Sequence, residues 1–249
     1  MSATFSILHA SYGRPAKAVM AIWSWFKHAA NRDQIEYVIA LNDDDPSLPQ
    51  YIELLKCARP FGLPVKIITG PFAGSAPAWD AAAKASSGLV LIQAQDDVEP
   101  PPAWDDRIMA KLYAATESLD PFGTPEFCYP WPTLPAFLAV SDGYRKDNLC
   151  CTAIMNRARY EQCGEFLHAG FRSVFSDDDV TLRAYADAAA GKCSLIEARD
   201  LVFTHRHHYH DKTVPYDETY ARENSAEAYA QGQALFMRRN AEILKFKTW

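Results

Sequence analysis

Hydrophobic and polar residues along the first hundred positions follow the rhythm of alternating strands and helices. Short apolar, β-prone runs predict strands, and longer runs with helical composition, ended by proline or glycine, predict the helices between them. The expected strands cover residues 4–10, 36–42, 64–70 and 89–95, and the expected helices cover residues 16–30, 51–62 and 75–88. The strand runs are almost wholly apolar, which is typical of strands covered on both faces. The pattern therefore predicts an α/β fold, with a mostly parallel sheet flanked by helices.

The first expected helix has a clear apolar stripe. At helical spacing, Val19, Ile22, Trp23 and Phe26 fall on one face. We expect Trp23 and Phe26, together with Met20, to pack in the core rather than to contact a ligand.

The second half of the chain has a less regular pattern. The expected elements are helices at 103–119 and 177–192, strand and loop at 127–140, a strand and a short helix within 150–166, and a strand at 193–208. Residues 216–249 predict a long C-terminal helix. Because no linker, repeat or low-complexity segment interrupts the chain, we expect one unit over 1–249, divided into 1–100, 101–215 and the C-terminal helix.

The carboxyl ends of parallel strands meet at one edge of a sheet, and such folds bind ligands there. Four loops are placed on this rim, at residues 9–14, 41–46, 69–74 and 93–97. The last loop ends in the adjacent acids Asp96 and Asp97, whose repulsion requires a cation, a helix end or solvent. The sequence therefore predicts one pocket at this edge, with carboxylates in it.

Composition and charge limit the classes of molecule that this protein is expected to bind and the compartment in which it is expected to work. The chain has 249 residues and a net charge of -6, so no general basic field attracts nucleic acid. No apolar run approaches the length of a membrane span, and the first residues lack the features of a signal peptide. No Cys-x-x-Cys pair occurs among the cysteines, which are Cys57, Cys128, Cys150, Cys151, Cys163 and Cys193. We therefore expect a cytoplasmic protein with reduced thiols.

Two further polar clusters follow in the second half. Asp177, Asp178 and Asp179 stand where a helix begins, and Ser176 or one of the acids is expected to cap its free N–H groups. Capping accounts for one or two acids rather than three. The second cluster is the histidine-rich segment 203–212, which is also open to interpretation as a zinc site, although histidines along one segment seldom all face one ion.

The order of these features resembles the glycosyltransferases of the GT-A fold, in particular the large family 2-like group, over residues 3–213. SILHASYGRP resembles the family's first strand and nucleotide-contacting loop, and VIALNDDDP resembles the second strand, whose terminal acid meets the base. GSAPAWDAAAKASSGLVLIQAQDDVEP resembles the helix, strand and metal-binding acidic motif. FSDDDVTLRAY resembles the segment with the catalytic base, and FTHRHH resembles the strand-end histidine that often completes the metal site.

The resemblance implies a divalent ion, Mn²⁺ or Mg²⁺, that neutralises the leaving diphosphate of a nucleotide sugar. The implied metal ligands are Asp96, Asp97 and either His205 or His207, two side chains that point the same way in an extended segment. The sequence departs from the family at Ala94, where an acid is usual. This departure makes Asp96 the main ligand and Asp97 its support.

The resemblance also implies a catalytic base in the second acidic cluster. Arg183, six residues on, marks Asp177 as the base in preference to Asp178. A base on the face opposite the leaving group implies inversion at the anomeric carbon. The implied donor-binding residues are Ser11, Arg14, Asn42, Asp43, Gly74, Trp79, Gln95, Asp96 and Lys212.

Several of these positions have an ordinary structural alternative. Asn42 and Asp43 are also typical of a turn before proline, Arg14 of a surface ion pair, and Trp79 of the core. The acceptor is expected in segments 127–140 and 167–172. In the first of these, the aromatic side chains that either stack on a sugar or pack in the core are Tyr129, Trp131 and Phe137.

The sequence thus predicts a metal-dependent, inverting glycosyltransferase, with 1–100 binding a UDP-linked sugar and 101–215 binding an acceptor hydroxyl. Two alternatives use the same residues. One is a metal-dependent hydrolase or phosphoesterase, and the other is a nucleotide-sugar-binding module without catalysis, to which Ala94 gives weight.

Overall fold

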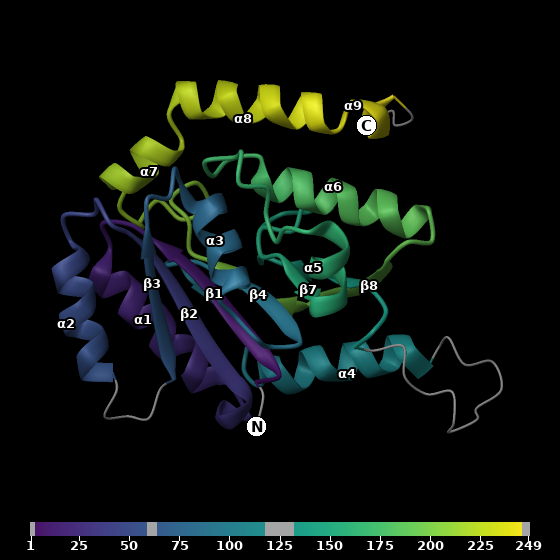
Figure 1. The fold of residues 1–249 in the computed structure, drawn as a ribbon, viewed down its shortest axis with the longest axis horizontal. Helices are drawn as coiled ribbons and strands as arrows, with labels where there is room; N and C mark the ends of the chain where they lie inside the picture. Colours follow the sequence, from purple (N-terminus) through teal and green to yellow (C-terminus); the bar gives the residue numbers. More distant parts are fainter. Residues whose placement is uncertain (1–2, 59–63, 118–131, 246–249) are drawn as a thin grey trace.

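The computed structural model describes residues 3–58, 64–117 and 132–245. Within these residues a seven-stranded sheet runs through the middle of the molecule in the order β3-β2-β1-β4-β7-β6-β8 (Figure 1). Its strands are β1 (Phe5–Ser11), β2 (Ile35–Asn42), β3 (Val65–Gly70), β4 (Val90–Ala94), β6 (Ala136–Ser141), β7 (Ile154–Asn156) and β8 (Ser194–Val202). All neighbouring pairs are parallel except those of β7, which is antiparallel to both β4 and β6. The predicted α/β class with a mostly parallel sheet is confirmed.

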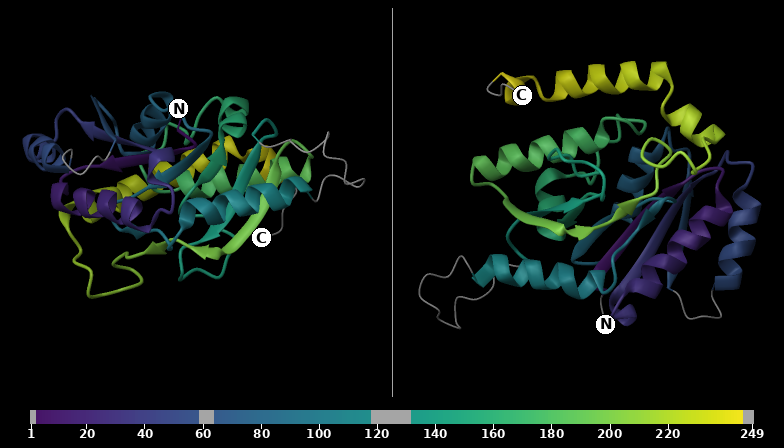
Figure 2. Two further views of the ribbon diagram at one scale, coloured as in Figure 1. Left: turned by 90° about the horizontal axis from the view of Figure 1, so that it is seen from below. Right: turned by 180° about the vertical axis from the view of Figure 1, so that it is seen from behind.

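Helices cover both faces of this sheet, as its apolar strands require (Figures 1 and 2). The helices on one face are α1 (Pro15–His28), α2 (Leu48–Ala58) and α4 (Trp104–Glu117). The helices on the other face are α3 (Ser75–Lys84), α5 (Arg157–Cys163), α6 (Ser176–Ala189) and α8 (Ala226–Arg239). A short 3-10 turn, η1 (Arg32–Gln34), precedes β2. Each face therefore has its own apolar core.

Helix α1 begins with Pro15 at its first position, where the missing N–H costs nothing. Ile22 and Phe26 are buried as predicted, and Trp23 packs at the edge of the core. The prediction for Met20 is wrong, since this side chain is 69 % exposed. Trp25 is fully buried and stacks on Phe203, so the buried stripe is rotated toward that residue.

The predicted C-terminal helix is divided. Its described part forms α7 (Glu218–Glu223), α8 and α9 (Ala241–Leu244). The first break lies at Ser225, whose side chain accepts a hydrogen bond from the Ala228 N–H and caps α8. The second lies at Asn240, whose amide donates to Asp179 on α6 at 2.7 Å. Local capping and a tertiary contact thus outweigh the helical pattern.

A two-stranded antiparallel ribbon joins the two halves of the chain. It consists of β5 (Val98–Glu99) and β9 (Thr204–His205). In this ribbon Val98 lies opposite His205. This pairing brings the histidine-rich segment close to the end of β4.

Among the aromatic residues predicted for acceptor binding, Phe137 is fully buried in the core. Tyr129 and Trp131 lie outside the described residues. In the described part of the chain, no helix combines the length and the apolar character that crossing a membrane requires.

Candidate active site

An open cleft of about 700 Å³ lies at the carboxyl edge of the sheet, where the four rim loops were predicted to meet. The predicted site residues that line it are Ser11, Arg14, Asn42, Gly74, Trp79, Gln95, Asp96, Asp97, Asp177, Asp178, His205 and His207. Two predicted residues are not among its lining residues. Asp43 is exposed and its neighbour Asp44 lines the cleft instead, while Lys212 is exposed beside the Tyr209 ring.

Asp97 and His205 are neighbours in the cleft because of the β5–β9 pairing. Asp97 Oδ1 lies 3.4 Å from His205 Nε2, and the Tyr220 hydroxyl donates a hydrogen bond to Asp97 Oδ2. Burial by itself would raise the pKa of Asp97, but His205 and Tyr220 together lower it to about 2. Asp97 therefore stays a carboxylate near neutral pH, in a form that binds cations.

Asp96 points away from this pair. His9 Nε2 donates to Asp96 Oδ1 at 3.0 Å, and the Ser11 hydroxyl donates to the same oxygen at 2.8 Å. The Tyr37 hydroxyl in turn lies 2.8 Å from His9 Nδ1, so a buried Tyr37–His9–Asp96 chain fixes this carboxylate. The sequence paired the histidine segment mainly with Asp96. The structure brings it to Asp97 instead, because consecutive side chains at the strand end point in different directions.

The unusual residue Ala94 has a structural explanation. Its side chain is fully buried in the apolar core, and its carbonyl accepts a hydrogen bond from Trp79 Nε1 at 2.9 Å. A carboxylate at this position would enter the apolar core, where burial of a charge is costly unless it is paired. Trp79 itself is 6 % exposed, so it is chiefly a core residue with an edge on the cleft.

The two glutamines beside Ala94 hold the backbone of the segment before β7. Gln95 Nε2 donates to the Cys151 carbonyl at 2.7 Å. Gln93 Oε1 accepts from the Ala153 N–H at 2.9 Å. Gln95 therefore lines the cleft while it fixes the place of Cys151.

Asp177 and Asp178 face the cleft from the first turn of α6. The cap position is Phe175, and the Ser176 hydroxyl donates to the Ser173 carbonyl instead of capping the helix. Of the acids, Asp177 accepts a free first-turn N–H, that of Asp178, at 3.1 Å. Burial raises the pKa of both acids, and the neighbouring Asp177 charge adds to the rise at Asp178, to about 7. The two neighbouring carboxyl groups thus both hold a proton more readily than an ordinary aspartate does.

Asp179, the third acid of the cluster, has a structural role. It is buried and bonded to Arg183, Arg239 and Asn240. It thereby ties α6 to the end of α8.

Arg14 and Asn42 are held by protein partners at the rim. The Arg14 guanidinium lies 4.1 Å from the centre of the Tyr220 ring and is bonded to Asp217, the residue before α7. The Asn42 amide donates to the Phe72 carbonyl at 2.7 Å. Both side chains therefore position loops around the cleft that they line.

Gly74, the residue before α3, approaches another loop closely. A Cβ atom there would lie 2.2 Å from the Arg172 carbonyl oxygen, and its φ of 156° disfavours other residues. The Arg172 carbonyl also accepts from the Ala76 N–H at 3.1 Å. Glycine at position 74 thus lets α3 dock on the loop that leads to α6.

We predict that Gly74→Ala destabilises the protein by more than about 2 kcal/mol, because the new methyl group displaces the Arg172 loop. Urea unfolding measures this change. The matched control is Gly191→Ala, where φ is 69° but no atom lies within 4 Å of the added Cβ. It should cost only about 1 kcal/mol, and equal losses for both variants would contradict the proposed close contact.

His207 lies beside His205, with ring centroids 5.1 Å apart. Burial and the charge of His205 lower the pKa of His207 to about 4. Its Nδ1 accepts from the Tyr209 N–H at 3.2 Å, and its ring contacts Tyr220. His207 is therefore a neutral wall of the cleft in this structure.

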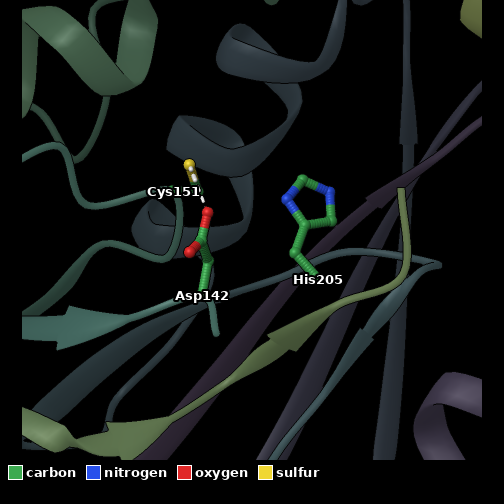
Figure 3. A group of neighbouring side chains, drawn as sticks. All are labelled: Asp142, Cys151 and His205. Carbon is green, nitrogen blue, oxygen red and sulfur yellow. Dashed lines mark hydrogen bonds between the residues drawn. The ribbon is translucent and has the colours of Figure 1, made fainter. Parts of the chain in front are cut away.

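His205 differs from His207, because both of its ring nitrogens are buried and make no hydrogen bond shorter than the 3.4 Å contact of Nε2 with Asp97. A buried imidazole next to a carboxylate, with one nitrogen left free, fits a divalent ion, which supplies the missing interaction. Among the described residues, one group of three potential ligands meets, namely Asp142, Cys151 and His205, with ligand atoms within 4.8 Å of one another (Figure 3). The alternative of a zinc site made by the histidine run alone finds no support among the described residues, since this group takes only His205 from that segment.

The sequence interpretation missed Asp142 and Cys151. Asp142 follows β6 directly, so the rule that singled out Asp96 and Asp97, an acid after a buried strand, would have found it. No local signal distinguishes Cys151 from the other cysteines.

The sequence matches no protein-family model and no curated protein. The three-dimensional structure does match solved structures. The mannosyltransferase PcManGT from Pyrobaculum calidifontis, solved with GDP-Man and Mn²⁺, aligns over 96% of this chain with a TM-score of 0.60 and 15% identity. This chain has the GT-A fold.

A second match to the GT-A fold is S. aureus TarS, which aligns over 96% of this chain with a TM-score of 0.59 and 14% identity. A form of TarS solved with UDP-GlcNAc aligns over the same share, with a TM-score of 0.52 and 14% identity. The present chain covers 65% of PcManGT and 43% of the longer TarS chain, so it spans less than two thirds of either. At these identities the likeness concerns the GT-A fold alone.

Proposed function

We propose that this protein is a metal-dependent, inverting glycosyltransferase that moves a sugar from a UDP-linked donor to an acceptor hydroxyl. The observation that carries the proposal is the pairing of Asp97 with the buried imidazole of His205 in a cleft that also contains Asp177 and Asp178. Bound nucleotides and Mn²⁺ in the solved neighbours support it: GDP-Man and Mn²⁺ in PcManGT, and UDP or UDP-GlcNAc in TarS.

In this proposal Asp97 and His205 hold the divalent ion, Mn²⁺ or Mg²⁺. When bound, the ion neutralises the charge that develops on the leaving diphosphate. The Asp97 carboxylate and an imidazole nitrogen of His205 are the donor types that Mn²⁺ accepts. Tyr220 fixes Asp97 in place from the opposite side.

The donor occupies the half formed by residues 1–100. Arg14 provides positive charge at the rim, and Asp96 retains acceptor capacity for a sugar hydroxyl, because a carboxylate has about four lone-pair sites. The acceptor lies against residues 101–215 and meets the donor at Asp177. We place the reaction in the cytoplasm, where cysteines such as the free Cys151 stay reduced.

Asp177 acts as the base in this scheme. It removes the proton from the acceptor hydroxyl as that oxygen attacks the anomeric carbon, on the face opposite the leaving diphosphate. The raised pKa of the acidic pair suits this role, since a base works best when its pKa lies near the operating pH.

Calorimetry with UDP, with and without Mn²⁺, followed by a donor screen for released nucleotide, tests the proposal. Mn²⁺-dependent UDP binding with sugar transfer supports it. Metal binding without nucleotide preference and with phosphoester cleavage would instead indicate a hydrolase. Nucleotide binding without transfer would indicate a binding module.

We predict that kcat/KM rises with pH and levels off once the base is deprotonated. Burial raises the pKa of Asp177, so activity is lost at a higher pH than for an ordinary aspartate as the pH falls. A profile that is flat between about pH 5 and 9 would contradict a carboxylate base with a raised pKa.

A further inference from the structure

Three side chains from separate elements converge on one side of the cleft. Asp142 follows β6, Cys151 precedes β7, and His205 ends β9. Their ligand atoms lie within 4.8 Å of one another, and the Cys151 thiol is oriented toward Asp142 Oδ2 at 3.7 Å (Figure 3). Carboxylate, thiol and imidazole are the side chains that bind Zn²⁺ in proteins.

The imidazole of His205 is oriented as a metal ligand requires. Figure 3 shows Nδ1, the ring nitrogen next to the side-chain stem, on the side of Cys151 and Asp142. The other nitrogen, Nε2, lies 3.4 Å from Asp97. Histidine ligands usually direct their second ring nitrogen to a carboxylate in this way. Because Nδ1 is buried and has no hydrogen-bond partner, an ion at Nδ1 would satisfy a group that the protein leaves open.

The positions of the other two ligands are fixed by the backbone. The Asp142 Oδ1 atom accepts from the N–H groups of Tyr144 and Arg145, at 2.9 and 2.8 Å, which leaves Oδ2 directed at the thiol. Gln95 holds the Cys151 carbonyl at 2.7 Å. The three ligands therefore sit on anchored segments rather than on free side chains.

We propose that Asp142, Cys151 and His205 form a second cation position in the cleft, which takes a thiophilic divalent ion such as Zn²⁺. Thiolate is a soft ligand, whereas Mn²⁺ and Mg²⁺ prefer oxygen. Binding replaces the thiol proton: the ion–sulfur bond forms, the S–H bond breaks, and the proton passes to solvent. A tetrahedral ion with bonds of about 2.0–2.3 Å would require the ligands to approach by the order of 1 Å.

Occupation of this position has a consequence for the proposed transferase, and this part rests on the proposed function. A neutral imidazole has one lone pair, so His205 binds an ion either through Nδ1 with Cys151 or through Nε2 with Asp97. Zn²⁺ at Asp142 and Cys151 thus deprives Mn²⁺ of its histidine ligand. Zn²⁺ is therefore an inhibitor of Mn²⁺-dependent donor binding.

The test uses Co²⁺ as a spectroscopic substitute for Zn²⁺ in the full-length protein. We expect a thiolate-to-cobalt charge-transfer band that Zn²⁺ abolishes by competition. Cys151→Ala should remove the band, and Asp142→Asn should weaken Co²⁺ affinity at least about 10-fold. The matched control is Cys163→Ser, which changes an exposed thiol and should leave the band intact. Absence of the band in the unaltered protein, or its persistence in Cys151→Ala, would overturn the site.

A second measurement separates this site from the proposed function. UDP affinity in Mn²⁺ is measured with and without Zn²⁺, in the unaltered protein and in Cys151→Ala. Zn²⁺ should weaken UDP binding at least about 10-fold in the former and have little effect in the latter. A cobalt band without Mn²⁺-dependent UDP binding would refute the transferase and leave the cation site standing. Mn²⁺-dependent UDP binding without a cobalt band would refute the cation site and leave the proposed transferase standing.

Discussion

Asp177→Asn should lower kcat for sugar transfer about 10²–10⁴-fold and leave UDP affinity nearly unchanged. The amide keeps the size of the side chain and removes its capacity to accept the proton of the acceptor hydroxyl. Asp177 lines the cleft from the first turn of α6, whereas the proposed nucleotide contacts come from the loops of residues 1–100. Its loss should therefore affect the chemical step rather than nucleotide binding. Initial rates at saturating donor, combined with calorimetry for UDP, measure the two effects separately.

The comparison variant is Asp33→Asn. Asp33 is an exposed acid in η1, before the amino end of β2 and so at the opposite edge of the sheet from the cleft. It should behave as the unaltered protein. If Asp177→Asn retains transfer while Asp178→Asn loses it, the base is Asp178. Full activity in both variants would contradict any base in this cluster.

Asp97→Asn should weaken UDP binding in the presence of Mn²⁺ by more than about 100-fold. Mutating a residue that only hydrogen-bonds to a metal ligand already lowers metal affinity about 10–100-fold, and Asp97 is proposed as a ligand itself. In the absence of Mn²⁺ the variant and the unaltered protein should bind UDP with similar affinity, because the nucleotide contacts of the first hundred residues remain. Calorimetry across a Mn²⁺ titration distinguishes the two conditions.

Asp96→Asn is the informative counterpart, because the Asp96 carboxylate is bonded to His9 and Ser11 instead of facing His205. Its effect on UDP affinity should be the same with and without Mn²⁺. If the metal dependence disappears in Asp96→Asn and persists in Asp97→Asn, the ion is held on the other carboxylate and the assignment is wrong.

The first half of the fold follows closely from local pattern. The apolar runs that became β1 to β4 and the helices between them are set by periodicity and by end signals such as Pro15. The rule that ligands lie at the carboxyl ends of parallel strands then placed the rim loops correctly around the cleft. The long C-terminal helix was overestimated, because the contact of Asn240 with Asp179 cannot be read from helical spacing.

The sequence by itself determined the class of fold, the edge of the sheet where the cleft lies, and the clusters that supply its carboxylates and histidines. These depend on periodicities of a few residues and on general rules of chain topology. Only the tertiary structure decided which groups meet. The antiparallel pairing of β5 with β9 places Asp97 beside His205. The placement of β6 and β7 brings Asp142 and Cys151 to the imidazole ring of the same histidine. Strand register across large sequence separations is a cooperative property of the packed sheet, and a shift of one residue would direct each of these side chains elsewhere.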